Sequence, residues 1–163
     1  MPQKIEPVCG PERDAGELGD VIQRVVAEVL ETMFFAEAIP SPCCHDWMGS
    51  AVSARVSFDG SHSGEMRLST SLYAADSIAC AFLGADPEEV IPAARVKVIL
   101  ELANILCGAT LSQLWPESKL ALGAPELTPA GEEFPACRLH HCFELPEGRL
   151  ALCMWWSEGA GPG

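Results

Sequence analysis

Apolar residues recur every three or four positions in some parts of the chain and every second position in others, and these periods predict helices and strands. Helical spacing predicts a first helix over 15–37, which ends before two prolines. A second helix is expected over 72–83, and a central one over 95–115. Alternation predicts strands over 51–58, 62–69, 134–143 and 149–156, with a weaker strand over 120–127.

The order of these elements indicates an α+β fold in which long helices pack on an antiparallel, meandering sheet. Short turns join the strands within 51–69 and within 134–156, so the order is helix, hairpin, helix, helix and three strands. A long helix followed by antiparallel strands occurs twice, which indicates a weak internal duplication. We expect a single domain over 15–157, with a flexible leader at 1–14 and a frayed tail at 158–163.

The central helix is apolar around most of its circumference, which is typical of a buried helix. Its polar positions fall within about 80° of one another, and we call this line the polar stripe. A polar line on a buried helix faces either solvent at a groove or a partner. The stripe includes a glycine, which costs about 1 kcal/mol relative to alanine inside a helix and leaves room for close approach. The polar stripe consists of Lys97, Glu101, Asn104, Gly108 and Ser112.

The net charge of −13 excludes several classes of partner. Phosphate backbones and anionic membranes both require clustered Lys and Arg, so we expect neither nucleic-acid nor membrane binding. The sequence contains no apolar run of the kind that forms a secretory signal or a membrane span. We therefore expect a cytoplasmic protein.

The eight cysteines are expected to be free thiols that act as small apolar side chains, because the chain is not small and shows no export signal. Two Cys/His groups, at 43–45 and 137–142, are candidate metal ligands. Strand alternation separates the second group, placing Cys137 with His141 on one face and the other two side chains on the opposite face. We therefore expect no bound metal. The remaining alternative is a zinc site formed by His140, Cys142 and either Cys43 or His45.

The chain has none of the common nucleophile or phosphate-binding motifs, so the polar stripe is the main candidate for chemistry. A Glu and an Asn three residues apart usually belong to a solvated helix face. However, Asn is a poor helix former, and this helix is otherwise too apolar to lie on the surface. An amide can both donate to and accept from a water molecule, which suits the orientation of a nucleophile.

The segment ILELANILCGATLSQL carries a Glu-x-x-Asn pattern that resembles the signature of the CheC/CheX family of chemotaxis phosphatases. LETMFF and LGAPELTPAG also resemble CheX-type members, and the resemblance covers most of 15–156 in element order. It implies a CheC-like fold and a phosphatase that docks this helix on a phosphorylated, CheY-like response-regulator receiver. It further implies a homodimer formed through sheet edges.

The resemblance also assigns roles to the stripe. Asn104 would position the attacking water, and Glu101 would pair with an active-site lysine of the receiver. The other stripe residues would contact the partner. Mg²⁺ would be supplied by the receiver, so the chain would need no cofactor of its own. The residues expected to contact the partner are Lys97, Gly108 and Ser112.

Three positions depart from the family pattern. Lys97 stands where the family commonly has Asp or Ser, and Pro125 lies slightly earlier than the family's proline. In the first helix Glu31 is followed three residues later by Phe34 instead of Asn, which implies a single site, as in CheX-type members. Lys97 keeps open a non-catalytic module of the same fold that binds a receiver or a flagellar-switch component. A third alternative is a metal-binding or redox protein that uses the Cys/His groups.

Overall fold

The computed structural model describes residues 15–42, 51–129 and 137–158. The predicted leader, the Cys-Cys-His segment and most of the predicted tail lie outside these ranges. The helices are α1 (Ala15–Phe34), α2 (Leu72–Leu83) and α3 (Pro92–Leu114), with a 3-10 turn, η2 (Pro87–Glu89), before α3. The strands are β1 (Ile39–Ser41), β2 (Ala51–Gly60), β3 (His62–Ser71), β4 (Leu120–Leu122), β5 (Glu126–Leu127), β6 (Leu139–Leu145) and β7 (Gly148–Glu158).

All seven strands form one antiparallel sheet in the order β1-β6-β7-β3-β2-β4, with β5 also paired to β2. This order is symmetric about the central β3–β7 pair. Each half contributes a long helix, an edge strand and a hairpin, and each edge strand pairs with the hairpin of the other half. The α+β class is thus confirmed, and the exchange of edge strands supports the internal duplication.

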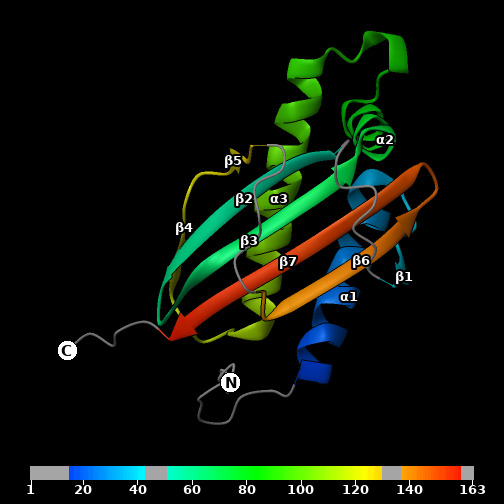
Figure 1. Cartoon of the computed structure of the whole chain (residues 1–163). Helices are drawn as coiled ribbons and strands as arrows, with labels where there is room; N and C mark the ends of the chain where they lie inside the picture. Colours follow the sequence, from blue (N-terminus) through cyan, green and yellow to red (C-terminus); the bar gives the residue numbers. More distant parts are fainter. Residues whose placement is uncertain (1–14, 43–50, 130–136, 159–163) are drawn as a thin grey trace.

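The helices lie against one face of the sheet, and the core lies between the two layers (Figure 1). Apolar residues from four adjacent strands stand opposite one another in register and form continuous rows toward the helices. One such row contains Val56, Met66, Met154 and Leu139. All four of these side chains are buried. The rows form the apolar layer on which α1 and α3 pack.

Local signals in the sequence set the ends of α2. The Ser71 hydroxyl accepts a hydrogen bond from the Ala74 N–H at 3.4 Å, as an N-cap does. Gly84 has φ +63°, the left-handed conformation that favours glycine, and it forms the C-cap directly after the predicted end of the helix at residue 83. The turn η2 follows Asp86, which forms a capping box with Glu89.

The bounds of several predicted elements were wrong, including the start of α3, at Pro92 instead of Arg95, and the span of β6, Leu139–Leu145 instead of 134–143. Helix α1 ends at Phe34 instead of Glu37, because Phe35 adopts φ +54° and stops the helix. The single strand expected over 120–127 is two short strands, both paired to β2, and β1 was not predicted at all. Such short strands exist only through their long-range pairing, which periodicity does not show. Among the described residues, no helix is long and apolar enough to cross a membrane.

The expectation of free cysteines was wrong for one pair. Cys137 and Cys153 form a disulfide with their Cα atoms 5.9 Å apart. Cys153 stands opposite His140 in the β6–β7 register, so the pair links the start of β6 to its neighbouring strand. Alternation did not place Cys137 correctly because this residue precedes β6 and does not follow the strand's period. Cys80 and Cys107 are free thiols.

Candidate functional site

The polar stripe runs along the outward side of α3. The opposite side of the helix is buried in the core from Val98 to Leu114. On the stripe, the side chains of Lys97, Glu101 and Ser112 are exposed. Asn104 and Gly108 lie between them and are half-buried. The stripe therefore faces outward from a helix that the core holds in place, as the sequence predicts.

Both ends of α3 are fixed by contacts with other elements. At the start, Arg95 Nε lies 2.9 Å from Asp76 Oδ1 of α2. After the end, the Trp115 ring stacks on the His62 ring with the centroids 3.8 Å apart, and it meets Trp156 edge-on at 5.6 Å. These contacts fix the helix at both ends and leave the polar stripe on a rigid support between them.

A hydrogen bond also joins α1 to the C-terminal end of α3: the Arg24 guanidinium donates to Gln113 Oε1 at 3.2 Å. This hydrogen bond joins the long helices of the two halves of the fold. Because Gln113 follows Ser112 directly, the last turn of the stripe is held against α1 as well as against the sheet. The position of the stripe is therefore set by three separate elements.

Gly108 gives the stripe a shallow centre. A Cβ atom placed on Gly108 would lie 3.9 Å from Leu122 Cδ2, with no other atom within 4 Å outside its own helix and chain neighbours. The fold therefore does not require glycine here for lack of space, and the missing side chain leaves the surface open to a partner. Leu122, on edge strand β4, is an apolar neighbour that the sequence did not assign to the site. Alternation of Leu120 and Leu122 signals a strand, although not its place beside α3.

The chemical groups of the stripe are a carboxylate and an amide three residues apart. Of the ion pairs between described residues, none involves Glu101 or Lys97. Cys107 follows closely in sequence, but it is buried, and burial raises the pKa of its thiol to about 12. A thiol with that pKa is not a nucleophile near neutral pH. The stripe therefore has the means to orient a water or contact a partner, without a covalent nucleophile of its own.

The internal symmetry identifies the counterparts of these residues on α1. Edge strand β1 begins at residue 39 and β4 at 120, so equivalent positions differ by 81. Glu101 then corresponds to Asp20, and both are exposed. Asn104 corresponds to Gln23, and both are half-buried. Glu31 and Phe34, the pair considered from the sequence, lie further along α1. Phe34 is buried and stacks on the Phe82 ring with the centroids 5.3 Å apart.

The Cys/His groups do not form a metal site within the described ranges, where no three His, Cys, Asp or Glu side chains are placed to hold an ion. His140 and Cys142 lie two residues apart on β6 and share the sheet face that carries Cys153. His141 lies on the other face, under α1: a Cβ atom on Gly19 would meet its Cε1 at 3.0 Å. Cys43 and His45, the other proposed ligands, lie outside the described residues.

Comparison with known families decides the assignment. The family model described as "Chemotaxis phosphatase CheX" matches residues 52–142, more than half of the chain, including α3 and the whole polar stripe. The chain belongs to the CheX family. The family assignment from the sequence is therefore confirmed. A search of curated proteins gives no match.

Solved structures with the CheX fold cover nearly all of the chain. Chemotaxis protein CheX from Vibrio vulnificus is 16% identical, with a TM-score of 0.71 over 90% of this chain and 100% of that chain. The CheX–CheY–BeF3–Mg²⁺ complex from Borrelia burgdorferi contains a chain that is 18% identical, with a TM-score of 0.66 over 85% and 97%. Thermotoga maritima FliY is 16% identical, with a TM-score of 0.60 over 85% and 86%. These likenesses confirm the CheC-like fold.

Proposed function

We propose that this CheX-family chain is a phosphatase that hydrolyses the aspartyl-phosphate of a CheY-like response-regulator receiver. The observation that carries the proposal is the exposed acid–amide pair, Glu101 and Asn104, on a helix fixed at both ends. The similar Borrelia chain was solved together with CheY, BeF3 and Mg²⁺. A complex of that kind, with this chain in place of its relative, would bring the stripe to a receiver. We also propose that the protein acts in the cytoplasm as a homodimer joined through its sheet edges.

In the proposed mechanism the chain supplies position and the receiver supplies charge. The Asn104 amide would hold a water in line with the phosphorus atom, accepting one hydrogen bond from it and directing its lone pair. The water oxygen forms the new bond to phosphorus while the bond to the aspartyl oxygen breaks, which releases inorganic phosphate and the free carboxylate. Because phosphoryl transfer depends mainly on positioning and charge stabilisation, no triad is required.

Glu101 would act before the chemical step. Its exposed carboxylate would pair with a receiver lysine and so set the register of α3 over the phosphoryl group. Mg²⁺ would be bound by the receiver, and this chain would add no metal ligand. Lys97, Gly108 and Ser112 would complete the contact along the stripe. If Glu101 and Asn104 have these separate roles, substitution of Glu101 should weaken receiver binding as well as slow hydrolysis.

The test is the decay of a phosphorylated, Mg²⁺-bound CheY-type receiver with catalytic amounts of this protein. Asn104→Ala should reduce the acceleration by about a hundredfold or more, the usual effect of losing one positioning group, while the melting temperature stays unchanged. Gln23→Ala, at the equivalent position of α1, is the matched control and should retain activity. Unchanged decay with several folded-protein preparations and receivers would contradict the phosphatase function.

A non-catalytic receiver-binding module is the second candidate. FliY and the FliM middle domain from Vibrio alginolyticus, the latter with a TM-score of 0.53, have the same fold. Lys97 favours this candidate because a cation at that position would repel a receiver lysine that approaches Glu101. A phosphorylation-dependent complex that persists without turnover would support it. Lys97→Ser would then be the first substitution to test for recovery of hydrolysis.

A further inference from the structure

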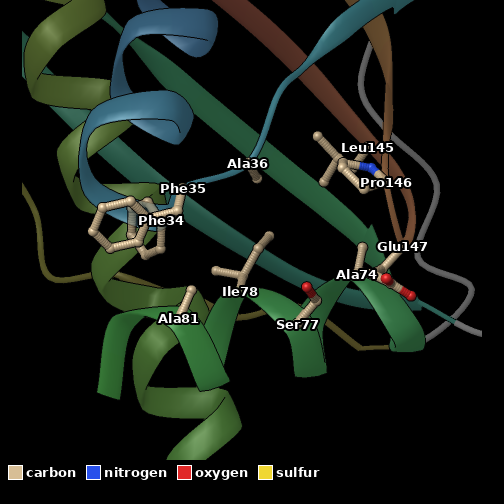
Figure 2. Close-up of a pocket in the computed structure, with 10 residues that line it drawn as sticks. All are labelled: Phe34, Phe35, Ala36, Ala74, Ser77, Ile78, Ala81, Leu145, Pro146 and Glu147. Carbon is tan, nitrogen blue, oxygen red and sulfur yellow. The ribbon is translucent and has the colours of Figure 1, made fainter. Parts of the chain in front are cut away.

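A cavity of about 160 Å³ lies between the end of α1, one side of α2 and the β6–β7 turn (Figure 2). No residue of α3 lines it, so it is separate from the polar stripe. Eight of its ten lining residues are apolar, and the other two are Ser77 and Glu147. An apolar cavity near 150 Å³ is large enough for a benzene ring, and therefore for one large apolar side chain. The apolar lining residues are Phe34, Phe35, Ala36, Ala74, Ile78, Ala81, Leu145 and Pro146.

Large apolar side chains are also exposed on the elements that line this cavity and on the neighbouring strand β1. Phe35 and Tyr73 are 81% and 80% exposed, one at the end of α1 and the other at the start of α2. Other exposed apolar residues come from the same elements and from β1. Clustered exposure of this kind marks interaction sites, whereas single exposed apolar residues do not. These residues are Met33, Ile39, Leu72, Phe82 and Leu83.

Phe35 is held in a conformation that glycine normally provides. Its φ is +54°, and the following N–H, of Ala36, donates to the Leu30 carbonyl at 3.0 Å, so the chain turns back over the last turns of α1. The left-handed conformation costs a residue with a side chain about 1–2 kcal/mol. Burial does not offset this cost, because most of the ring is in solvent. A strained, exposed phenylalanine beside an open cavity with mostly apolar lining residues indicates a ligand contact.

The charged residues near the cavity are mainly acidic. Glu147 lines the cavity, and Glu37 directly follows the lining residue Ala36. Glu31, one turn before Phe34, is also exposed. Of the nearby basic residues, Arg95 is paired with Asp76, and Arg149 stands opposite Glu144 in the β6–β7 register. An apolar occupant with basic flanking residues fits this rim better than a neutral or acidic one.

We propose that this cavity binds an amphipathic segment of a partner protein. One large apolar side chain of the segment fills the cavity against Ile78 and Ala81, and the Phe35 ring covers it. Lys or Arg residues on either side of that anchor lie against Glu37 and Glu147. This is the helix-in-groove mode of recognition, in which a few apolar anchors supply affinity and flanking charges supply selectivity. The site is independent of the polar stripe and of the proposed hydrolysis.

The test uses the full chain and two fluorescent synthetic helical peptides, one of Leu-Lys-Lys-Leu repeats and one with Glu in place of every Lys. The Leu–Lys peptide should bind, and the Leu–Glu peptide should not. Phe35→Gly should weaken binding tenfold or more while the melting temperature is unchanged or higher, because glycine relieves the backbone strain. Ala81→Leu, which fills the cavity from α2, should weaken binding to a similar extent.

General attraction of a basic peptide to an acidic protein is controlled by a matched pair of charge reversals. Glu147→Lys should weaken binding, whereas Glu117→Lys, beyond the far end of α3, should not. Equal binding by all variants, or equal binding of the two peptides, would overturn the proposal. So would a change in sedimentation of Phe35→Gly without peptide, because that result would place a second copy of the chain on this surface.

Discussion

His141 shows how one residue's place in the register determines its protonation. It stands at the end of a core row with Ala54, Leu68 and Leu152, on the side of the sheet that faces the helices. Gly19 of α1 passes directly over the ring, and a Cβ there would come within 3.0 Å of it. Burial in this position disfavours the charged imidazolium and lowers the pKa of His141 below its ordinary value of 6.5.

The lowered pKa of His141 predicts acid-sensitive stability. As the pH falls through 6.5, the unfolded imidazole binds a proton while the folded one remains neutral, so the unfolded state binds more protons and the free energy of unfolding decreases. The loss ends once the pH is below the folded-state pKa. Urea unfolding of the wild type and of His141→Gln between pH 7.5 and 5 measures this effect. The carboxylates titrate in both proteins, so their difference isolates His141; parallel pH profiles would contradict the prediction.

At the scale of elements, α3 combines a buried side with an open one. The sequence predicts this helix because the periodic pattern of its apolar and polar residues lies within one continuous segment. The structure adds only the contacts that fix its ends. The open side matters for function only if a partner reaches the helix backbone. Gly108 is the position at which that requirement can be tested without disturbing the core.

Gly108→Leu is expected to prevent docking and keep the fold. The new Cβ would lie at an ordinary contact distance from Leu122, and leucine is a better helix former than glycine by about 1 kcal/mol. The melting temperature should therefore be equal or higher, while receiver affinity, measured by fluorescence anisotropy, should fall at least tenfold. Ala27→Leu, at the equivalent position of α1, is the matched control. Unchanged affinity of Gly108→Leu would show that the partner does not approach the stripe.

Elements defined by adjacent residues could be predicted from the sequence, and those defined by distant pairing could not. The bounds of α2 follow from Ser71 and Gly84, which act on neighbouring residues. In contrast, β1 has only three residues and exists because it pairs with β6, about 100 residues further along. The polar stripe was predictable for the same reason as α2. Its neighbour Leu122 was not, because β4 reaches α3 only through its pairing with β2.

At the scale of the whole molecule, two halves of similar design are joined by exchange of their edge strands. Each of the edge strands β1 and β4 pairs with the hairpin of the other half, so neither half completes its part of the sheet alone. The two long helices then lie side by side against one face of the sheet (Figure 1). The symmetric design gives the molecule two comparable helix surfaces. Only the one on α3 carries the Glu-x-x-Asn pattern.

The disulfide adds one covalent link to this assembly. Cys137 and Cys153 are separated by 16 residues, and their bond closes a loop that contains β6, the turn after it and the first half of β7. Closing a loop of about 15 residues restricts the unfolded chain and stabilises the folded state by about 3 kcal/mol. The hairpin contributes Leu145 and Leu150 to the core. Loss of the disulfide should therefore lower the stability of the whole sheet, which we expect to unfold cooperatively.

Reduction is therefore expected to lower the free energy of unfolding by about 3 kcal/mol. The measurement is urea unfolding of the oxidised protein with and without dithiothreitol, with peptide mapping after alkylation to show that Cys137 and Cys153 become labelled. A Cys137→Ala/Cys153→Ala variant should unfold near the reduced midpoint and show no response to dithiothreitol. Cys107→Ala should still respond, because its thiol is free and buried in the core. An unchanged midpoint in the wild type, despite complete labelling of the pair, would show that the two halves hold the β6–β7 hairpin in place without the covalent link.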